Sequence, residues 1–224
     1  MHDNPCITKV LVPLEFLHRA TLPPGAPPPA RIALFPGSWN PPTIAHLDIA
    51  RAAACWAHEV ILVIPRAFPH KAYDGAPFPV RCQLLAALAQ SQLAPPHLAP
   101  PALSAAISDG GLYADIATEA RAALGPAAEL AILCGRDAAE RWASWPYPDP
   151  AHLDRMLLHC RLLVAARRGE YTPPPRLSHR ISTLPLPAAH DDVSSTDVRH
   201  RIQHHLPWQH LVPPAIHEYV RQSF

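Results

Sequence analysis

Short apolar runs alternate with segments of helical periodicity along most of this chain. An apolar run bounded by proline, glycine or charged residues is typical of a strand covered on both faces of a parallel sheet. Such runs occupy residues 31–36, 59–65, 102–107, 129–134, 161–166 and 180–184. Periodic apolar positions predict helices at residues 43–57, 79–92 and 112–124, directly after 135–137, from 193 onward, and at the C-terminus. This alternation predicts an α/β fold with a doubly wound parallel sheet.

The pattern is weaker before residue 31. Residues 7–17 are apolar enough to dock as a short helix or strand, and residues 22–29 are rich in proline and read as a semi-rigid spacer. We therefore expect a short N-terminal extension over residues 1–30, followed by a single Rossmann-like domain over residues 31–224.

Composition argues against several classes of protein. With 19 basic and 18 acidic side chains the net charge is +1, so bulk charge does not favour a nucleic-acid or membrane partner. The chain shows no apolar run of membrane-spanning length and no signal peptide, which predicts a cytoplasmic protein. The five cysteines are scattered and odd in number, and there is no HExxH motif or tight Cys/His cluster, so we expect reduced thiols and no metal site of the protein's own.

The stretch Gly37–His46, GSWNPPTIAH, lies between the first predicted strand and the first predicted helix. A helix start presents free backbone N–H groups and the positive end of the helix dipole, which together attract an anion. Thr43 and His46 are three residues apart and share one face of the first turn. The stretch therefore predicts a phosphate cradle with a hydroxyl and an imidazole at its mouth; the alternative is an ordinary turn with a packed histidine.

A second helix start, VSSTDVR over residues 193–199, lies far downstream. Ser194 with Asp197 three residues later is a capping-box pattern, and the following hydroxyls and Arg199 could hold phosphates. An ordinary N-cap followed by a surface arginine is the alternative. Gly37, Lys71, Gly135 and Ser194 all follow predicted strands. Because ligands of open α/β sheets bind beyond the carboxyl ends of the strands, we expect these four residues to face one crevice.

With both motifs in order, the chain resembles the nucleotidyltransferase superfamily of the (H/T)xGH and ISSTxxR motifs. Within it, the chain looks most like the nicotinate or nicotinamide mononucleotide adenylyltransferases. Phe68-Pro69-His70-Lys71 resembles the PPHK loop of that family, residues 133–137 resemble its LGxD turn, and Trp145 falls at its substrate-stacking tryptophan. The resemblance covers about residues 31–223.

Four departures from the family pattern stand out. Thr43 replaces the first histidine found in many members, Ala45 replaces a glycine and Trp39 replaces a common phenylalanine. Tyr113-Ala114 lies where bacterial members often have Tyr-Thr, which bears on the choice of acceptor more than on the chemistry.

The resemblance implies attack of a mononucleotide phosphate on the α-phosphorus of ATP, with release of pyrophosphate, in NAD biosynthesis. Mg²⁺ would bind through the ATP phosphates and need no carboxylate cage. The implied catalytic residues are His46, Thr43, Arg199 and Lys71. The implied ATP-binding residues are Gly37, Ser38, Trp39, His46, Gly135, Asp137, Ser194, Ser195, Thr196 and Arg199. The implied acceptor-binding residues are Lys71, Tyr113, Trp145 and Arg168.

Other functions stay open at this point. Tyr113-Ala114 motivates a transferase of the same superfamily that uses another phosphorylated acceptor or CTP. Thr43 and the N-terminal extension motivate a non-catalytic nucleotide-binding protein. A class I synthetase fragment is disfavoured because VSSTDVR stands where a KMSKS-like loop would be needed. The expected partners are ATP and a pyridine mononucleotide, and the chain could form a homo-oligomer.

Overall fold

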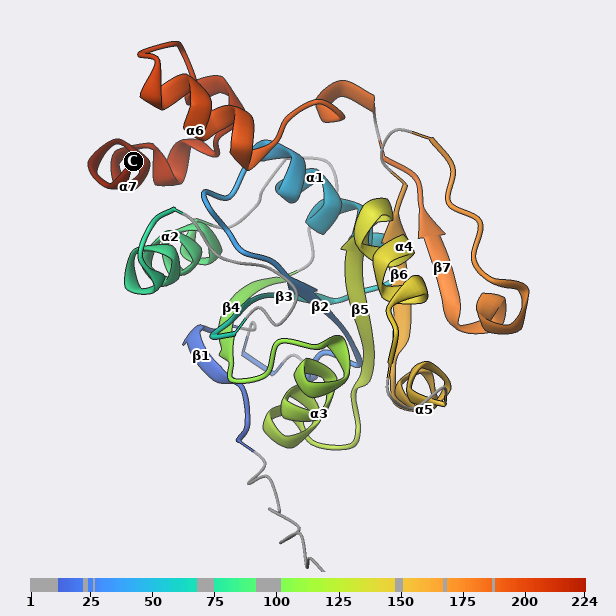
Figure 1. Ribbon diagram of the computed structural model, residues 1–224. Coiled ribbons are helices and arrows are strands. Elements are labelled where there is room, and N and C mark those ends of the chain that lie inside the picture. Colours follow the sequence, from blue (N-terminus) through green and yellow to red (C-terminus); the bar gives the residue numbers. More distant parts are fainter. Residues whose placement is uncertain are drawn as a thin grey trace, which may run out of the picture.

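A seven-stranded sheet forms the centre of the computed structural model, which describes residues 12–21, 24–25, 27–67, 75–91, 102–147, 151–166, 169–186 and 188–224. The strands are β1 (Glu15–His18), β2 (Arg31–Pro36), β3 (Glu59–Pro65), β4 (Ala102–Ser108), β5 (Glu129–Gly135), β6 (Arg161–Ala165) and β7 (Ile181–Leu184). Their order across the sheet is β1-β4-β3-β2-β5-β6-β7 (Figure 1).

Helices cover the sheet on both faces. They are α1 (Ile44–Ala52), α2 (Phe78–Gln90), α3 (Tyr113–Leu124), α4 (Arg136–Ser144), α5 (His152–His159), α6 (Ser195–Gln203) and α7 (His217–Ser223). Short 3-10 turns lie at Ala53–Cys55, Pro175–Arg180, Ala188–His190, Gln209–Leu211 and Pro214–Ile216. The sequence pattern does not predict α5, which is short and follows a proline-rich stretch.

The predicted α/β fold is confirmed, since strands β2 to β7 pair in parallel throughout. β1 is the exception, because it pairs antiparallel with β4 at one edge of the sheet. It comes from the segment expected to form an extension, so that segment contributes a strand to the domain's own sheet.

Alternating side chains of β2 show why a continuous apolar run forms a central strand. Ala33 and Phe35 pack in one apolar layer with α1 and α2, whereas Ile32 and Leu34 pack in the other with α3 and α4. Ala33 and Leu34 are fully buried. A strand with both faces covered needs apolar residues at every position, which is the pattern in the sequence.

The chain reverses direction across the sheet between β2 and β5. From β2 it proceeds to β3 and β4, and α3 then returns it to β5, which lies on the other side of β2. Helices α1 and α4, which follow these two neighbouring strands, therefore belong to opposite layers. The carboxyl ends of β2 and β5 form the switch point at which sheets of this kind bind ligands.

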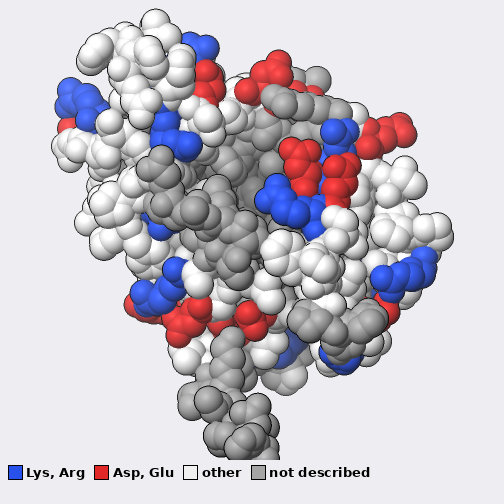
Figure 2. All heavy atoms as spheres, in the orientation of Figure 1, with Lys and Arg blue, Asp and Glu red and all other residues white. Residues whose placement is uncertain are grey.

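Two further properties of the molecule concern membranes and charge. No helix in the described part of the chain is long and apolar enough to cross a membrane. On the face shown in Figure 2, basic and acidic side chains lie next to each other in small groups.

A buried carboxylate shapes the turn between β4 and α3. Glu119 is 5% exposed and accepts hydrogen bonds from Ser108 Oγ (2.6 Å) and from the backbone N–H groups of Asp109 (3.1 Å) and Gly110 (2.8 Å). A Cβ at Gly110 would lie 2.3 Å from Asp115 Cβ, so only glycine fits there. One side chain thus supports the turn that leads into α3.

We predict that Glu119→Ala lowers the free energy of unfolding by about 2–4 kcal/mol, because three donors, two of them buried, lose their acceptor. Urea denaturation followed by circular dichroism measures this change. The exposed Glu129 is the control, and Glu129→Ala should stay within about 0.5 kcal/mol of the parent protein. Equal effects of the two substitutions would contradict the role of Glu119.

Candidate active site

The turn after β2 is held by one carbonyl of β3. Val63 O accepts the backbone N–H of Gly37 at 3.0 Å and the indole Nε1–H of Trp39 at 2.8 Å. Trp39 is 1% exposed and has a φ of 53°. A Cβ at Gly37 would lie 2.9 Å from its indole ring. Glycine is needed at this position because the Trp39 side chain folds back over it.

This arrangement changes the roles predicted for the turn. The sequence predicts phosphate contacts from the backbone N–H groups of Gly37, Ser38 and Trp39, but the N–H of Gly37 is already donated to Val63. Those of Ser38 and Trp39 make no hydrogen bond with any residue that the structure describes. These two N–H groups stay predicted phosphate donors, and the Trp39 side chain belongs to the core.

Thr43 caps α1 and orients His46. Its backbone N–H donates to His46 Nδ1 at 3.1 Å, and its hydroxyl oxygen lies 2.7 Å from the same nitrogen. A ring nitrogen that accepts an N–H carries no proton, so a neutral imidazole here has its proton on Nε2. Thr43 is fully buried. The predicted phosphate donor Thr43 therefore faces His46, and His46 is presented as an Nε2–H donor.

The second predicted motif contacts the first directly. Ser195 Oγ donates to the carbonyl oxygen of Pro41 at 2.8 Å, and Arg199 Nη1 donates to that of Asn40 at 2.8 Å. The other Arg199 nitrogen, Nη2, lies 3.4 Å from Thr196 Oγ1. The starts of α1 and α6 thus meet at one place. Ser195, a predicted phosphate ligand, uses its hydroxyl to join the two motifs.

The start of α6 has the predicted N-cap. Ser194 Oγ accepts the backbone N–H of Asp197 at 3.1 Å, while the Asp197 carboxylate accepts from Arg201 Nε at 2.8 Å. Just upstream, His190 Nδ1 pairs with the carboxylate of Asp48 on α1. This pair is a second link between the two helix starts.

Asn40 and Arg81 support the site but are absent from the predicted set. Asn40 Oδ1 accepts the backbone N–H of Ala76 at 3.1 Å. Arg81 is 4% exposed and donates to the carbonyl oxygens of Ser38 (3.0 Å) and Ala76 (3.2 Å). Together they join the phosphate turn to the residues before α2. An arginine within the apolar stripe of a helix is the sequence signal that could have revealed Arg81.

Gly135 and Asp137 lie on the β5 side of the switch point. Gly135 is the N-cap of α4 with a φ of −78°, and a Cβ built there would have no atom within 4 Å. The Asp137 side chain is 85% exposed. The backbone at Gly135 therefore borders open space. The exposed Asp137 carboxylate lies 4.0 Å from Arg136 Nε, and its predicted contact with ribose hydroxyls stays a prediction.

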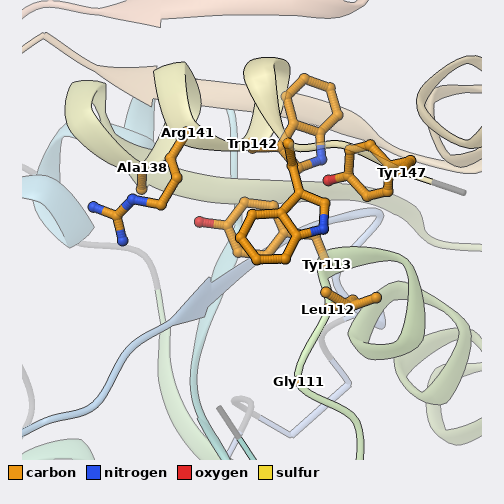
Figure 3. A pocket seen from close by; sticks show the side chains of 8 residues that line it. Gly111, Leu112, Tyr113, Ala138, Arg141, Trp142 and Tyr147 are labelled. Carbon is orange, nitrogen blue, oxygen red and sulfur yellow. The ribbon is translucent and has the colours of Figure 1, made fainter. Parts of the chain in front are cut away.

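Two predicted acceptor residues, Tyr113 and Trp145, line the same recess (Figure 3). This recess, called the aromatic recess below, encloses about 440 Å³ including its part open to solvent. Its lining residues are Gly111, Leu112, Tyr113, Ala138, Arg141, Trp142, Trp145 and Tyr147. It lies between the start of α3, which follows β4, and α4 with the residues just after it, which follow β5.

The polar groups of the aromatic recess are mostly neutral. Burial raises the pKa of Tyr113 well above its ordinary value, and the Tyr113 hydroxyl is hydrogen-bonded to Cys134. Burial also raises the pKa of Tyr147 to about 12 and that of Cys134 to about 12. All three groups stay protonated near neutral pH, so Arg141 supplies the charge in the lining.

Lys71 and Arg168 lie outside the described residues, so their predicted contacts with phosphate or acceptor stay predictions. The same applies to the Phe68-Pro69-His70-Lys71 loop as a whole.

Comparison with known proteins shows the family of the chain. Residues 34–201 match the family described as cytidylyltransferase-like. The chain belongs to this family. It is 27% identical over 208 residues to a probable nicotinate-nucleotide adenylyltransferase of Moorella thermoacetica, covering 86% of this chain and 90% of that protein. It is 29% identical over 218 residues to a protein of the same name from Chromobacterium violaceum, covering 87% and 97%.

Solved structures show the same fold. Plasmodium falciparum nicotinic acid mononucleotide adenylyltransferase in complex with NaAD superposes with a TM-score of 0.64 at 16% identity, over 86% of this chain and 95% of that one. The complex of the same enzyme with APC gives a TM-score of 0.63 at 15% identity, again over 86% and 95%. The cytidylyltransferase-like chain described here thus shares a Rossmann-like architecture with these enzymes.

We predict that Gly135→Val raises the KM for ATP about tenfold or more without loss of stability, because the added side chain projects into open space that a nucleotide would enter. Steady-state kinetics and thermal unfolding measure the two effects. Gly37→Val is the contrasting variant, and it should lower the unfolding temperature because its Cβ meets the Trp39 indole. An unchanged KM in Gly135→Val would place the nucleotide elsewhere.

Proposed function

We propose that this protein joins the AMP moiety of ATP to nicotinate or nicotinamide mononucleotide and releases pyrophosphate, as an adenylyltransferase of NAD biosynthesis. The observation that carries the proposal is the meeting of the α1 and α6 starts through Ser195 and Arg199, next to the oriented His46. Both relatives named above are probable nicotinate-nucleotide adenylyltransferases, which supports the same activity here.

The triphosphate of ATP would lie between the two helix starts. Free N–H groups and helix dipoles favour its negative charge there, and Arg199 retains guanidinium N–H groups besides the one donated to Asn40. His46 Nε2–H would donate to a non-bridging oxygen on the α-phosphorus. Charge grows on that oxygen in the transition state, so a donor held in place by Thr43 stabilises the transition state more than the ground state.

The acceptor would place its pyridine ring in the aromatic recess. Tyr113 and Trp145 line that recess, and a flat ring can stack on such side chains. An oxygen of the acceptor phosphate then forms a bond to the α-phosphorus of ATP, and the bond from that phosphorus to the bridging oxygen breaks. The electron pair leaves with pyrophosphate, so the reaction needs no covalent enzyme intermediate.

Mg²⁺ would enter with ATP. Among the described residues, no group of three or more His, Cys, Asp or Glu side chains could hold a metal ion. The groups around the cradle are hydrogen-bond donors, which suit phosphate oxygens; the cation would therefore be held through the phosphates and would neutralise the leaving pyrophosphate. Cytoplasmic location and self-association stay predictions.

Product analysis tests the proposed activity. The purified chain is incubated with ATP, Mg²⁺ and either pyridine mononucleotide, and pyrophosphate and dinucleotide are quantified by chromatography. We expect equal amounts of the two products. A parallel panel contains CTP in place of ATP and other phosphorylated acceptors. Turnover only in that panel, or tight ATP binding without turnover, would contradict the proposal and favour another transferase or a non-catalytic binding protein.

We predict that His46→Ala lowers kcat by about 100- to 1000-fold with little change in the KM for ATP, because it removes a donor whose contact strengthens in the transition state. Single-turnover and steady-state kinetics measure the loss. His58→Ala is the control, since His58 precedes β3 at the opposite ends of the strands. A His46→Ala protein with near-normal kcat would remove this imidazole from the mechanism.

A further inference from the structure

The fixed charge of the aromatic recess has no partner among the residues that the structure describes. Arg141, on the last turn of α4, is the charged residue among the lining residues. Within the part of the chain that the structure describes, its guanidinium makes no hydrogen bond and no ion pair. Arg136 on the same helix, by contrast, has its Nε 3.5 Å from Glu140 Oε1. The recess thus presents a cation that no acidic side chain of the described residues neutralises.

Arg141 lies where a ring in the recess would meet it. Figure 3 shows its guanidinium and the Tyr113 hydroxyl extending to the same side of the recess. The two groups are close enough for the charge of Arg141 to lower the pKa of Tyr113, although burial raises that pKa by more. Tyr113 and Arg141 line the same recess, so a planar ring stacked on Tyr113 would share that recess with the guanidinium.

A second donor without a partner among the described residues belongs to another lining residue of the recess. Trp142 is 6% exposed, and its indole Nε1–H is buried without a partner among the described residues. The Tyr113 hydroxyl is satisfied by Cys134. The lining groups that lack partners, Arg141 and Trp142, are therefore both donors. A buried donor without an acceptor is costly, so the complementary ligand group is an acceptor, and beside a guanidinium a negative acceptor gains most.

We propose that Arg141 is a specificity-determining residue that pairs with a carboxylate on the pyridine ring and selects nicotinate over nicotinamide mononucleotide. This inference rests on the proposed function. A ring carboxylate and a ring carboxamide have nearly the same shape, so the walls of the recess separate them poorly. The carboxylate is ionised at neutral pH and accepts two parallel N–H groups from a guanidinium, whereas the carboxamide is neutral and offers one oxygen.

Kinetic selectivity tests the proposal. The ratio of kcat/KM for nicotinate mononucleotide to kcat/KM for nicotinamide mononucleotide is measured for the parent protein and for Arg141→Gln. We expect this ratio to fall about 10- to 100-fold, because a charge-assisted pair is lost. The fall should come from a lower kcat/KM for nicotinate mononucleotide, while kcat/KM for nicotinamide mononucleotide stays the same. The KM for ATP should not change. Arg141→Lys keeps the charge without the planar fork and should recover part of the ratio.

Arg176→Gln is the matched control. It removes one positive charge from a half-exposed side chain that pairs with Asp154 at 2.8 Å, away from the recess, and should leave the ratio unchanged. Equal losses with both acceptors in Arg141→Gln would overturn the proposal, because Arg141 would then serve a group common to both, such as the phosphate. No loss with either acceptor would also overturn it.

Direct binding separates recognition from turnover and from folding. Quenching of tryptophan fluorescence by each mononucleotide reports binding next to Trp145, and circular dichroism shows whether each variant is folded. Arg141→Gln should bind nicotinate mononucleotide about tenfold or more weakly and nicotinamide mononucleotide as before. A parent protein inactive with both mononucleotides contradicts the proposed function and this inference together; an active parent with an unchanged ratio contradicts only the inference.

Discussion

The hydrogen bond from the Arg199 guanidinium to the carbonyl oxygen of Asn40 joins residues 159 positions apart, and the rest of the site depends on this junction. Ser195 adds a hydrogen bond to Pro41 beside it. Both donors bind backbone carbonyl oxygens of the turn after β2. These oxygens have no partner in the sheet and would otherwise need a hydrogen bond from water. The junction brings the two helix starts together, so that the two predicted phosphate sites lie side by side.

The site consists almost entirely of hydrogen-bond donors. Besides the backbone N–H groups of the turn, the two motifs carry the His46 imidazole and the Arg199 guanidinium, which is joined to the turn through Asn40. Thr43 makes this possible at His46, because its backbone N–H occupies Nδ1 and leaves the proton on the other nitrogen. Such preorganised donors stabilise negative charge as it develops, and no side chain needs to act as a nucleophile. This chemistry suits phosphoryl transfer.

A further set of residues supports these donors without facing the ligand. Trp39 and Gly37 share the Val63 carbonyl, and Arg81 donates to the carbonyl of Ser38. The Asp48–His190 pair links α1 to the segment before α6. Because these contacts are buried or partly buried, they hold the turn in one conformation. The catalytic geometry therefore depends on residues that no nucleotide would touch.

The sequence by itself determined the fold and the position of the two motifs. The apolar runs and helix starts that define the α/β sheet are local patterns, and local chain geometry sets their periods. Only the tertiary structure decided what Gly37 and Ser195 contact, since each of these two predicted phosphate ligands proved to have a partner in another segment. It also decided the antiparallel pairing of β1 and the position of Arg141, because contacts between distant segments depend on how the layers pack, and spacing along the chain does not encode that packing.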